Sequence, residues 1–193
     1  MDYIKQITEF IPANEQESQD KKVMLDYISK FPHNILSREN EFAHITSSGF
    51  VMNEQLDKVL MVHHNIRNTW AWTGGHSDGD PDFLHVAIKE AKEETGIKDV
   101  IPLTKSIVAI DILPVYGHVK NNKYVSGHQH LSVAYILIAS EKETLIVKED
   151  ENSGVRWFGL DKFNKDYFDV KDVYLYNKLI HRAKQINNSR EFY

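Results

Sequence analysis

The sequence predicts an α+β fold in which helices cover both faces of a β-sheet, with a helical extension at the N-terminus. Strand-like and helical segments alternate after residue 42, whereas the first 41 residues show helical spacing alone. A strongly amphipathic helix is expected over residues 81–95. The length of 193 residues suits one domain with extra helix. We therefore expect an extension over residues 1–41 and the main domain, including a closing helix, over 42–193.

The N-terminal extension is expected to form two helices. Both predictions rest on apolar residues repeated at helical spacing, and the second helix should end near Pro32. The apolar positions are Ile4, Ile7, Phe10 and Ile11, then Val23, Met24, Tyr27 and Ile28. We expect these helices to pack on the main domain or on a partner in a dimer.

Strand patterns begin at Phe42. Residues 42–46, 50–52 and 58–64 read as strands, and Asn53-Glu54 between the last two indicates a hairpin turn. Trp70-Ala71-Trp72 follows, and then residues 73–80 form what we predict to be a polar, glycine-rich loop. Further strands are predicted over 106–113, 131–139 and 155–158, and a closing helix carries apolar residues from Val170 onward.

The helix predicted over residues 81–95 has clear ends. Asp80 is the expected N-cap, Pro81 suits the first helical position, and Gly96 suits the left-handed residue after the last turn. Its apolar face is formed by Leu84, Ala87, Ile88 and Ala91.

The overall composition excludes several classes of protein. The formal net charge of −5 argues against a general nucleic-acid binder, and the absence of cysteine rules out disulfides, zinc-thiolate sites and thiol nucleophiles. No signal peptide or apolar membrane span is visible, so we expect a cytoplasmic protein. An acidic protein that handles phosphates needs added positive charge, which a bound metal ion supplies.

Three glutamates lie on one face of the strong helix. Glu90, Glu93 and Glu94 are three and four residues apart, so their carboxylates are within reach of one another. A hard divalent ion such as Mg²⁺ or Mn²⁺ would relieve their repulsion. The alternative is an ordinary solvated face with Lys89 and Lys92 as neighbours. Gly74-Gly75 just before the helix favours the metal site, because a backbone without Cβ atoms can approach a metal and a diphosphate closely.

These residues resemble the Nudix box, which reads Gly, five residues, Glu, seven residues, Arg-Glu, an apolar residue, any residue, Glu-Glu, any residue, Gly, apolar. Gly75 begins the match and the segment from Lys89 to Ile97 ends it, with the full spacing kept. Pro81 replaces the first Glu, and Lys89 replaces the Arg. The resemblance covers residues 42–190 and implies a Nudix-type α/β/α sandwich with a mixed sheet. It also implies a Mg²⁺-dependent (or Mn²⁺-dependent) pyrophosphohydrolase.

The resemblance assigns roles to residues of the box. It implies that Glu93 and Glu94 ligate the metal, with the Gly74 carbonyl completing the set. Glu90 is either another ligand or the general base. In some family members the base comes from a later loop, and Glu151 is then the candidate, against the alternative of a solvated acidic loop.

Substrate-binding residues are harder to choose. We predict that four residues contact the substrate, namely Trp70, Gly75, His76 and Lys89. Trp70, Trp72, Tyr116 and Tyr124 are aromatic residues that could stack a nucleobase, although aromatic residues in strands are more often core. His63, His64, His128 and His130 could form a metal site with His76, but satisfied structural histidines are the commoner case.

The predicted activity is hydrolysis of a phosphoanhydride bond in a small nucleoside-diphosphate-linked substrate, such as ADP-ribose, a nucleotide sugar or a nucleotide. The alternative is a catalytically weak Nudix-fold nucleotide sensor, with Pro81 and Lys89 as its signature. An isomerase of this fold would need a catalytic cysteine, which is absent. Neither the substrate nor the oligomeric state, including a homodimer, is decided by the sequence.

Overall fold

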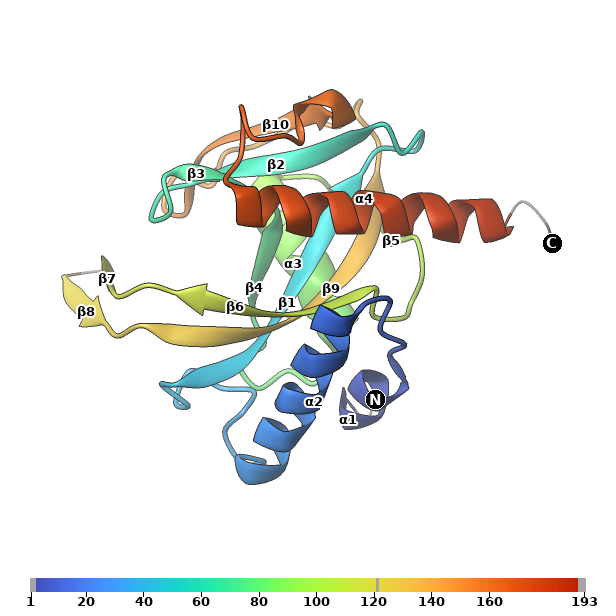
Figure 1. Cartoon of the computed structure of the whole chain (residues 1–193). Helices are drawn as coiled ribbons and strands as arrows, with labels where there is room; N and C mark the ends of the chain where they lie inside the picture. Colours follow the sequence, from blue (N-terminus) through green and yellow to red (C-terminus); the bar gives the residue numbers. More distant parts are fainter. Residues whose placement is uncertain (1–2, 121, 191–193) are drawn as a thin grey trace.

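A computed structural model describes residues 3–120 and 122–190 of the chain. Within these residues an eight-stranded mixed sheet lies between helices, which confirms the predicted sandwich (Figure 1). None of the helices in these ranges is long and apolar enough to cross a membrane. The helices are α1 (Tyr3–Glu9), α2 (Glu15–Lys30), α3 (Phe83–Thr95) and α4 (Val170–Arg190), with a 3₁₀ turn η1 (Leu160–Lys162). The strands are β1 (Ala43–Met52), β2 (Lys58–His64), β3 (Thr69–Ala71), β4 (Thr73–His76), β5 (Val100–Pro102), β6 (Ala109–Val115), β7 (His118–Lys120), β8 (Lys123–Val125), β9 (His128–Ala139) and β10 (Asn152–Gly159).

The sheet is built around a parallel pair. The order is β10-β2-β1-β9-β5, with β3 paired to β2, β4 to β1 and β6 to β9. β1 and β9 run parallel over ten residue pairs, and the other strand pairings of this sheet among the described residues are antiparallel. The predicted hairpin of β1 and β2 is confirmed, with its turn closed from the Asn53 N–H to the Lys58 carbonyl at 3.1 Å.

Side chains alternate across β1, so each face of the sheet has its own apolar core. Ile45 and Val51 pack with α1, α2 and α3, including Phe83 of α3. Phe50 and Met52 pack on the other face with α4. Figure 1 shows α4 across one face of the sheet with α3 behind it. The N-terminal helices thus share a core with the rest of the chain, because Ile7, Met24 and Ile28 belong to the same cluster as Ile45.

Two local predictions were wrong. Residues 73–76 form strand β4 rather than a loop, because they pair with residues 46–49 of β1. α3 begins at Phe83 with Asp82 as its N-cap, so neither Asp80 nor Pro81 holds the helical position that we predicted. The Asp82 side chain accepts a hydrogen bond from the His85 N–H at 3.1 Å. The left-handed conformation of Gly96, with φ of 77°, is confirmed.

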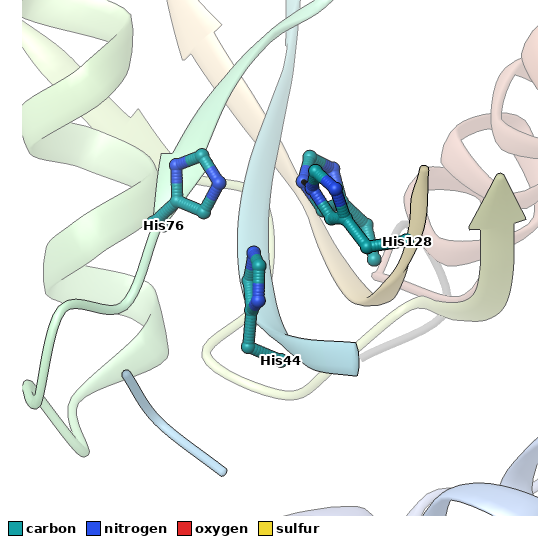
Figure 2. A group of neighbouring side chains, drawn as sticks. His44, His76 and His128 are labelled. Atoms are coloured by element: carbon teal, nitrogen blue, oxygen red, sulfur yellow. Dashed lines mark hydrogen bonds between the residues drawn. The ribbon is translucent and has the colours of Figure 1, made fainter. Parts of the chain in front are cut away.

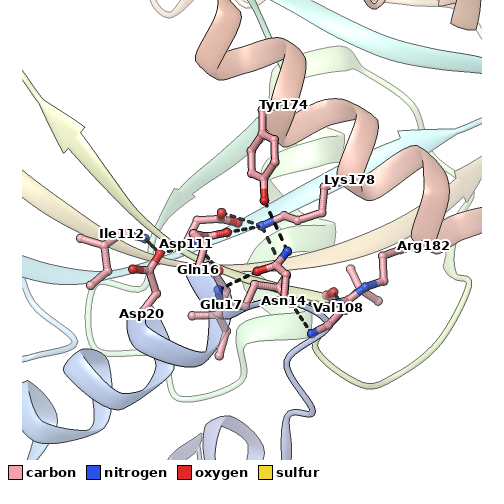
Figure 3. Close-up of polar contacts among 12 residues, drawn as sticks. Asn14, Gln16, Glu17, Asp20, Val108, Asp111, Ile112, Tyr174, Lys178 and Arg182 are labelled. Atoms are coloured by element: carbon pink, nitrogen blue, oxygen red, sulfur yellow. Dashed lines mark hydrogen bonds and ion pairs between the residues drawn. The ribbon is translucent and has the colours of Figure 1, made fainter.

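A buried ionic network joins the N-terminal helices to α4 (Figure 3). Glu17 of α2 is fully buried and pairs with Arg182 at 2.6 Å and Lys178 at 3.3 Å. Lys178 also pairs with Asp111 of β6 at 2.6 Å. Two acidic and two basic side chains therefore neutralise one another between α2, β6 and α4, and they fix the position of the N-terminal segment.

Candidate functional site

The glycines of β4 lie directly against the acidic face of α3. A Cβ atom added to Gly75 would lie 2.4 Å from Cδ of Glu90, so this close approach requires glycine. The Gly74 N–H donates a hydrogen bond to Oε1 of Glu94 at 3.0 Å. Gly74, Gly75, Glu90 and Glu94 are therefore neighbours, as their spacing in the sequence predicted.

Burial makes the negative charges of this group costly. Glu94 is 6% exposed, and burial, with added repulsion from Glu90 and Glu151, raises its pKa to about 8 even though the Gly74 N–H opposes the shift. Burial also raises the pKa of Glu90, and repulsion from Glu93 adds to the effect. Carboxylates held together in this way favour a bound proton or a bound cation.

Glu151 approaches the same group from the loop before β10. Lys148 belongs to the same loop, and its Nζ links the loop to α3 because it lies 3.1 Å from Glu151 and 4.0 Å from Glu93. The loop is anchored where Asn152 Nδ2 donates to the Glu94 carbonyl at 2.9 Å. The Glu151 side chain is 39% exposed. Its role as the general base stays a prediction.

Lys89 contacts the glutamates rather than standing apart from them. Its Nζ lies 3.6 Å from Glu90 and 3.5 Å from Glu93. These contacts suit a residue that orients and neutralises the carboxylates, and its predicted contact with substrate remains untested. Asp80, which precedes Pro81, pairs with His85 at 2.9 Å.

The aromatic residues lie in different surroundings. Trp70 is half-buried, with the Arg156 guanidinium 4.5 Å from its ring centre and the Phe158 ring at 5.0 Å, so a cation already covers part of the indole. Trp72 is core, as expected of an aromatic residue near a strand. Tyr116 and Tyr124 are 77% and 72% exposed, which contradicts the expectation of core positions for them.

The predicted position of His76 was wrong in one respect. His76 ends strand β4 instead of lying in a loop. It gathers with His44, His128 and His130, so two of the four other histidines that we considered, His128 and His130, do join it. His63 instead bonds Ser153 at 2.8 Å. His44 was not predicted, because no motif links residue 44 to the other three.

Arg38 is a second residue that the sequence did not indicate. It pairs with Asp78 through two hydrogen bonds, with Nε 2.8 Å from Oδ1. Its pKa is raised, first by the bond to Asp78 and also by attraction to Glu90 and Glu151. The N-terminal segment therefore brings a cation to the neighbourhood of the carboxylates, which only the tertiary structure reveals.

The NUDIX domain model matches residues 43–179. A probable DHNTP pyrophosphohydrolase of Lactococcus lactis subsp. cremoris is 27% identical over 143 residues, covering 74% of this chain and 81% of that protein. An RNA pyrophosphohydrolase of Pelagibacter ubique is 25% identical over 145 residues, covering 72% and 91%. A Clostridium perfringens NUDIX hydrolase structure covers 75% of this chain and 96% of its own, at 22% identity and a TM-score of 0.47. Because the NUDIX match spans well over half of the chain, this protein belongs to the NUDIX family.

Proposed function

We propose that this protein is a pyrophosphohydrolase that cleaves a phosphoanhydride bond in a small nucleoside-diphosphate-linked substrate with the help of Mg²⁺ or Mn²⁺. The observation that carries the proposal is the contact of Glu90 and Glu94 with the glycines of β4, with Glu93 on the same helix beside them. The two relatives with curated names are both called pyrophosphohydrolases, one for DHNTP and one for RNA. The net charge of −5 favours a small substrate over RNA for this chain.

The residues present fit a hard divalent cation. Glu90 and Glu94 are carboxylates whose pKa values are raised mainly by burial, so each gains from a positive charge nearby. Glu93 adds a third set of oxygen atoms, and Mg²⁺ and Mn²⁺ prefer oxygen ligands. We assign Glu90, Glu93 and Glu94 as the residues that would hold the ion, with the Gly74 carbonyl as a further donor.

The chain's own groups divide the remaining tasks. When bound, the cation would neutralise diphosphate oxygens and make water a better nucleophile. Glu151, or Glu90 if it is not a ligand, accepts the proton of the attacking water. Lys148 holds Glu151 at 3.1 Å, and Lys89 offsets the charge of Glu90 and Glu93. The absence of a side chain at Gly75 lets the Glu90 carboxylate lie directly against the backbone of β4.

A weak hydrolase that acts as a nucleotide sensor is the second candidate. Pro81 stands where the box has its first Glu, and its side chain has no carboxylate to add to Glu90, Glu93 and Glu94. It is exposed and lies before α3. Lys89 keeps the positive charge of the usual Arg but lacks its two-pronged geometry. A sensor would bind nucleotides with the same glutamates and release no phosphate.

The test is a panel of ADP-ribose, nucleotide sugars, nucleoside triphosphates and dinucleoside polyphosphates, incubated with Mg²⁺ or with EDTA. Hydrolysis is followed by product chromatography. Glu93→Gln and Glu94→Gln should each abolish turnover while circular dichroism stays unchanged. Glu54→Gln, an exposed change in the β1–β2 turn, is the matched control. Glutamine variants that turn over as fast as the parent would contradict the proposal, and tight binding of a nucleotide without turnover would favour the sensor.

A further inference from the structure

Four histidines from three strands meet at one end of the sheet. One ring nitrogen from each of His44, His76, His128 and His130 lies within 4.8 Å of the others. Figure 2 shows the rings of His44, His76 and His128 around a common space. Neighbouring ring centres in the cluster are 4.9–5.4 Å apart. Such convergence of nitrogen ligands is what a metal site in a protein requires.

The sheet register explains why the rings converge. His44 of β1 lies opposite His130 of β9 in the parallel pair, and His128 is on the same side of β9 two residues earlier. His76 of β4 lies opposite Thr46, which is on the same side of β1 as His44. Three strands thus place four imidazoles on one face. Because Gly75 faces Glu90, the adjacent His76 points to the other side of β4 from the glutamates.

Hydrogen bonds to the backbone leave two rings ready to act as ligands. His44 Nδ1 donates to the Asn40 carbonyl, and His128 Nδ1 donates to the Ser126 carbonyl, both at 2.9 Å. In a neutral ring the other nitrogen, Nε2, then carries a lone pair. Metal-binding histidines are usually oriented by this kind of bond. His44 is 4% exposed, and its Nε2 has no hydrogen-bond partner among the described residues.

The geometry also indicates the class of ion. His128 Nε2 and His130 Nε2 are 3.3 Å apart. Two nitrogens on a tetrahedral zinc ion, each at about 2.0–2.1 Å from it, are about 3.3–3.4 Å apart. Four imidazoles without a carboxylate suit Zn²⁺, Co²⁺, Ni²⁺ or Cu²⁺ rather than Mg²⁺.

We propose that His44, His76, His128 and His130 bind one divalent transition-metal ion of the zinc type, separately from the hard cation expected at Glu90, Glu93 and Glu94. The ion would tie the first residues of β1 and β9 to the end of β4. Since β4 also carries Gly74 and Gly75, the ion would stabilise the strand that faces the glutamates.

Co²⁺ is the probe for this site, because tetrahedral Co²⁺ bound by imidazoles absorbs visible light more strongly than octahedral Co²⁺. The full-length protein is treated with EDTA, dialysed, and titrated with Co²⁺ in excess Mg²⁺, which keeps Co²⁺ from the carboxylates. We expect one strongly absorbing equivalent, displaced by Zn²⁺, and a thermal midpoint raised by several degrees. His44→Gln and His76→Asn should lose both signals, whereas His33→Gln, an exposed control, should keep them.

The variants also separate this proposal from the proposed activity. Glu94→Gln should keep the Co²⁺ spectrum even though it loses turnover. Equal binding of Co²⁺ by the parent and a folded His44→Gln or His76→Asn variant would overturn the proposal. So would loss of the spectrum in Glu94→Gln, which would place the ion among the carboxylates. His76 is only half-buried, so His76→Asn provides the test if His44→Gln fails to fold.

Discussion

Removing the carboxylate of Glu17 should destabilise the whole protein. Glu17 is fully buried in α2, and its carboxylate pairs with Arg182 and Lys178 of α4. Its Oε2 also accepts the Ala13 N–H at 2.9 Å. In Glu17→Ala, Asp111 is the acid left in this network to balance two buried basic groups. An unpaired buried charge costs far more than a broken surface pair, since it has neither water nor a counterion.

The expected magnitude follows from that imbalance. Breaking a buried pair by deleting one partner costs about 3–5 kcal/mol. With a urea slope of about 2 kcal/mol per molar, the midpoint of unfolding should fall by about 2 M. Urea titration followed by tryptophan fluorescence measures this shift. Glu15→Gln, an exposed change on the same helix, is the control and should alter the free energy of unfolding by less than about 0.5 kcal/mol.

The result also tests how the N-terminal segment is attached. A loss of less than about 1 kcal/mol in Glu17→Ala would mean that Arg182 and Lys178 reach water without Glu17. The reasoning from a closed ionic network between α2 and α4 would then be refuted.

Two further predictions concern a close contact and a titration. Gly75→Ala would place a Cβ 2.4 Å from Cδ of Glu90, so we expect kcat/KM to fall by about 10²-fold. Gly127→Ala is the control, because its nearest contact would be 3.3 Å, and it should have no such effect. Equal activity of the two variants would contradict the assigned geometry. Burial raises the pKa of Asp111 from 3.8 to about 6 despite Lys178, so the folded state binds this proton more tightly than the unfolded state. The contribution of Asp111 to the free energy of unfolding should fall by about 2 kcal/mol as pH rises from about 4 to about 6. Urea titrations of the parent and of Asp111→Asn across that range measure the difference, which should change with pH; a constant difference would contradict the shift.

Local sequence signals predicted the elements that local physics controls. The end of α3 at Gly96 follows from the tolerance of glycine for the left-handed conformation. The spacing of Glu90, Glu93 and Glu94 fixes their common helix face whatever surrounds it. The start of α3 was missed by two residues, since Asp80 and Asp82 are both good caps and the chain uses Asp82.

Strand β4 shows where local signals fail. Glycines have low strand propensity, so residues 73–76 read as a loop. They form a strand because β1 offers a pairing edge and Glu90 leaves no space for a side chain at Gly75. The tertiary contact that determines this strand therefore also explains its glycines.

The sequence by itself determined the acidic helix face, the glycines before it and the sandwich of helices and strands, because each depends on residues near one another in the chain. Only the tertiary structure decided that Glu151 and Arg38 approach the glutamates, that Glu17 is buried against α4, and that His44 joins the later histidines. These partners are separated by tens of residues or more, and the pairing of β1 with β9 and β4 brings the histidines together. A local sequence pattern cannot predict the register in which β1 pairs with β9 and β4, because the packing of the apolar faces of all the elements together determines that register.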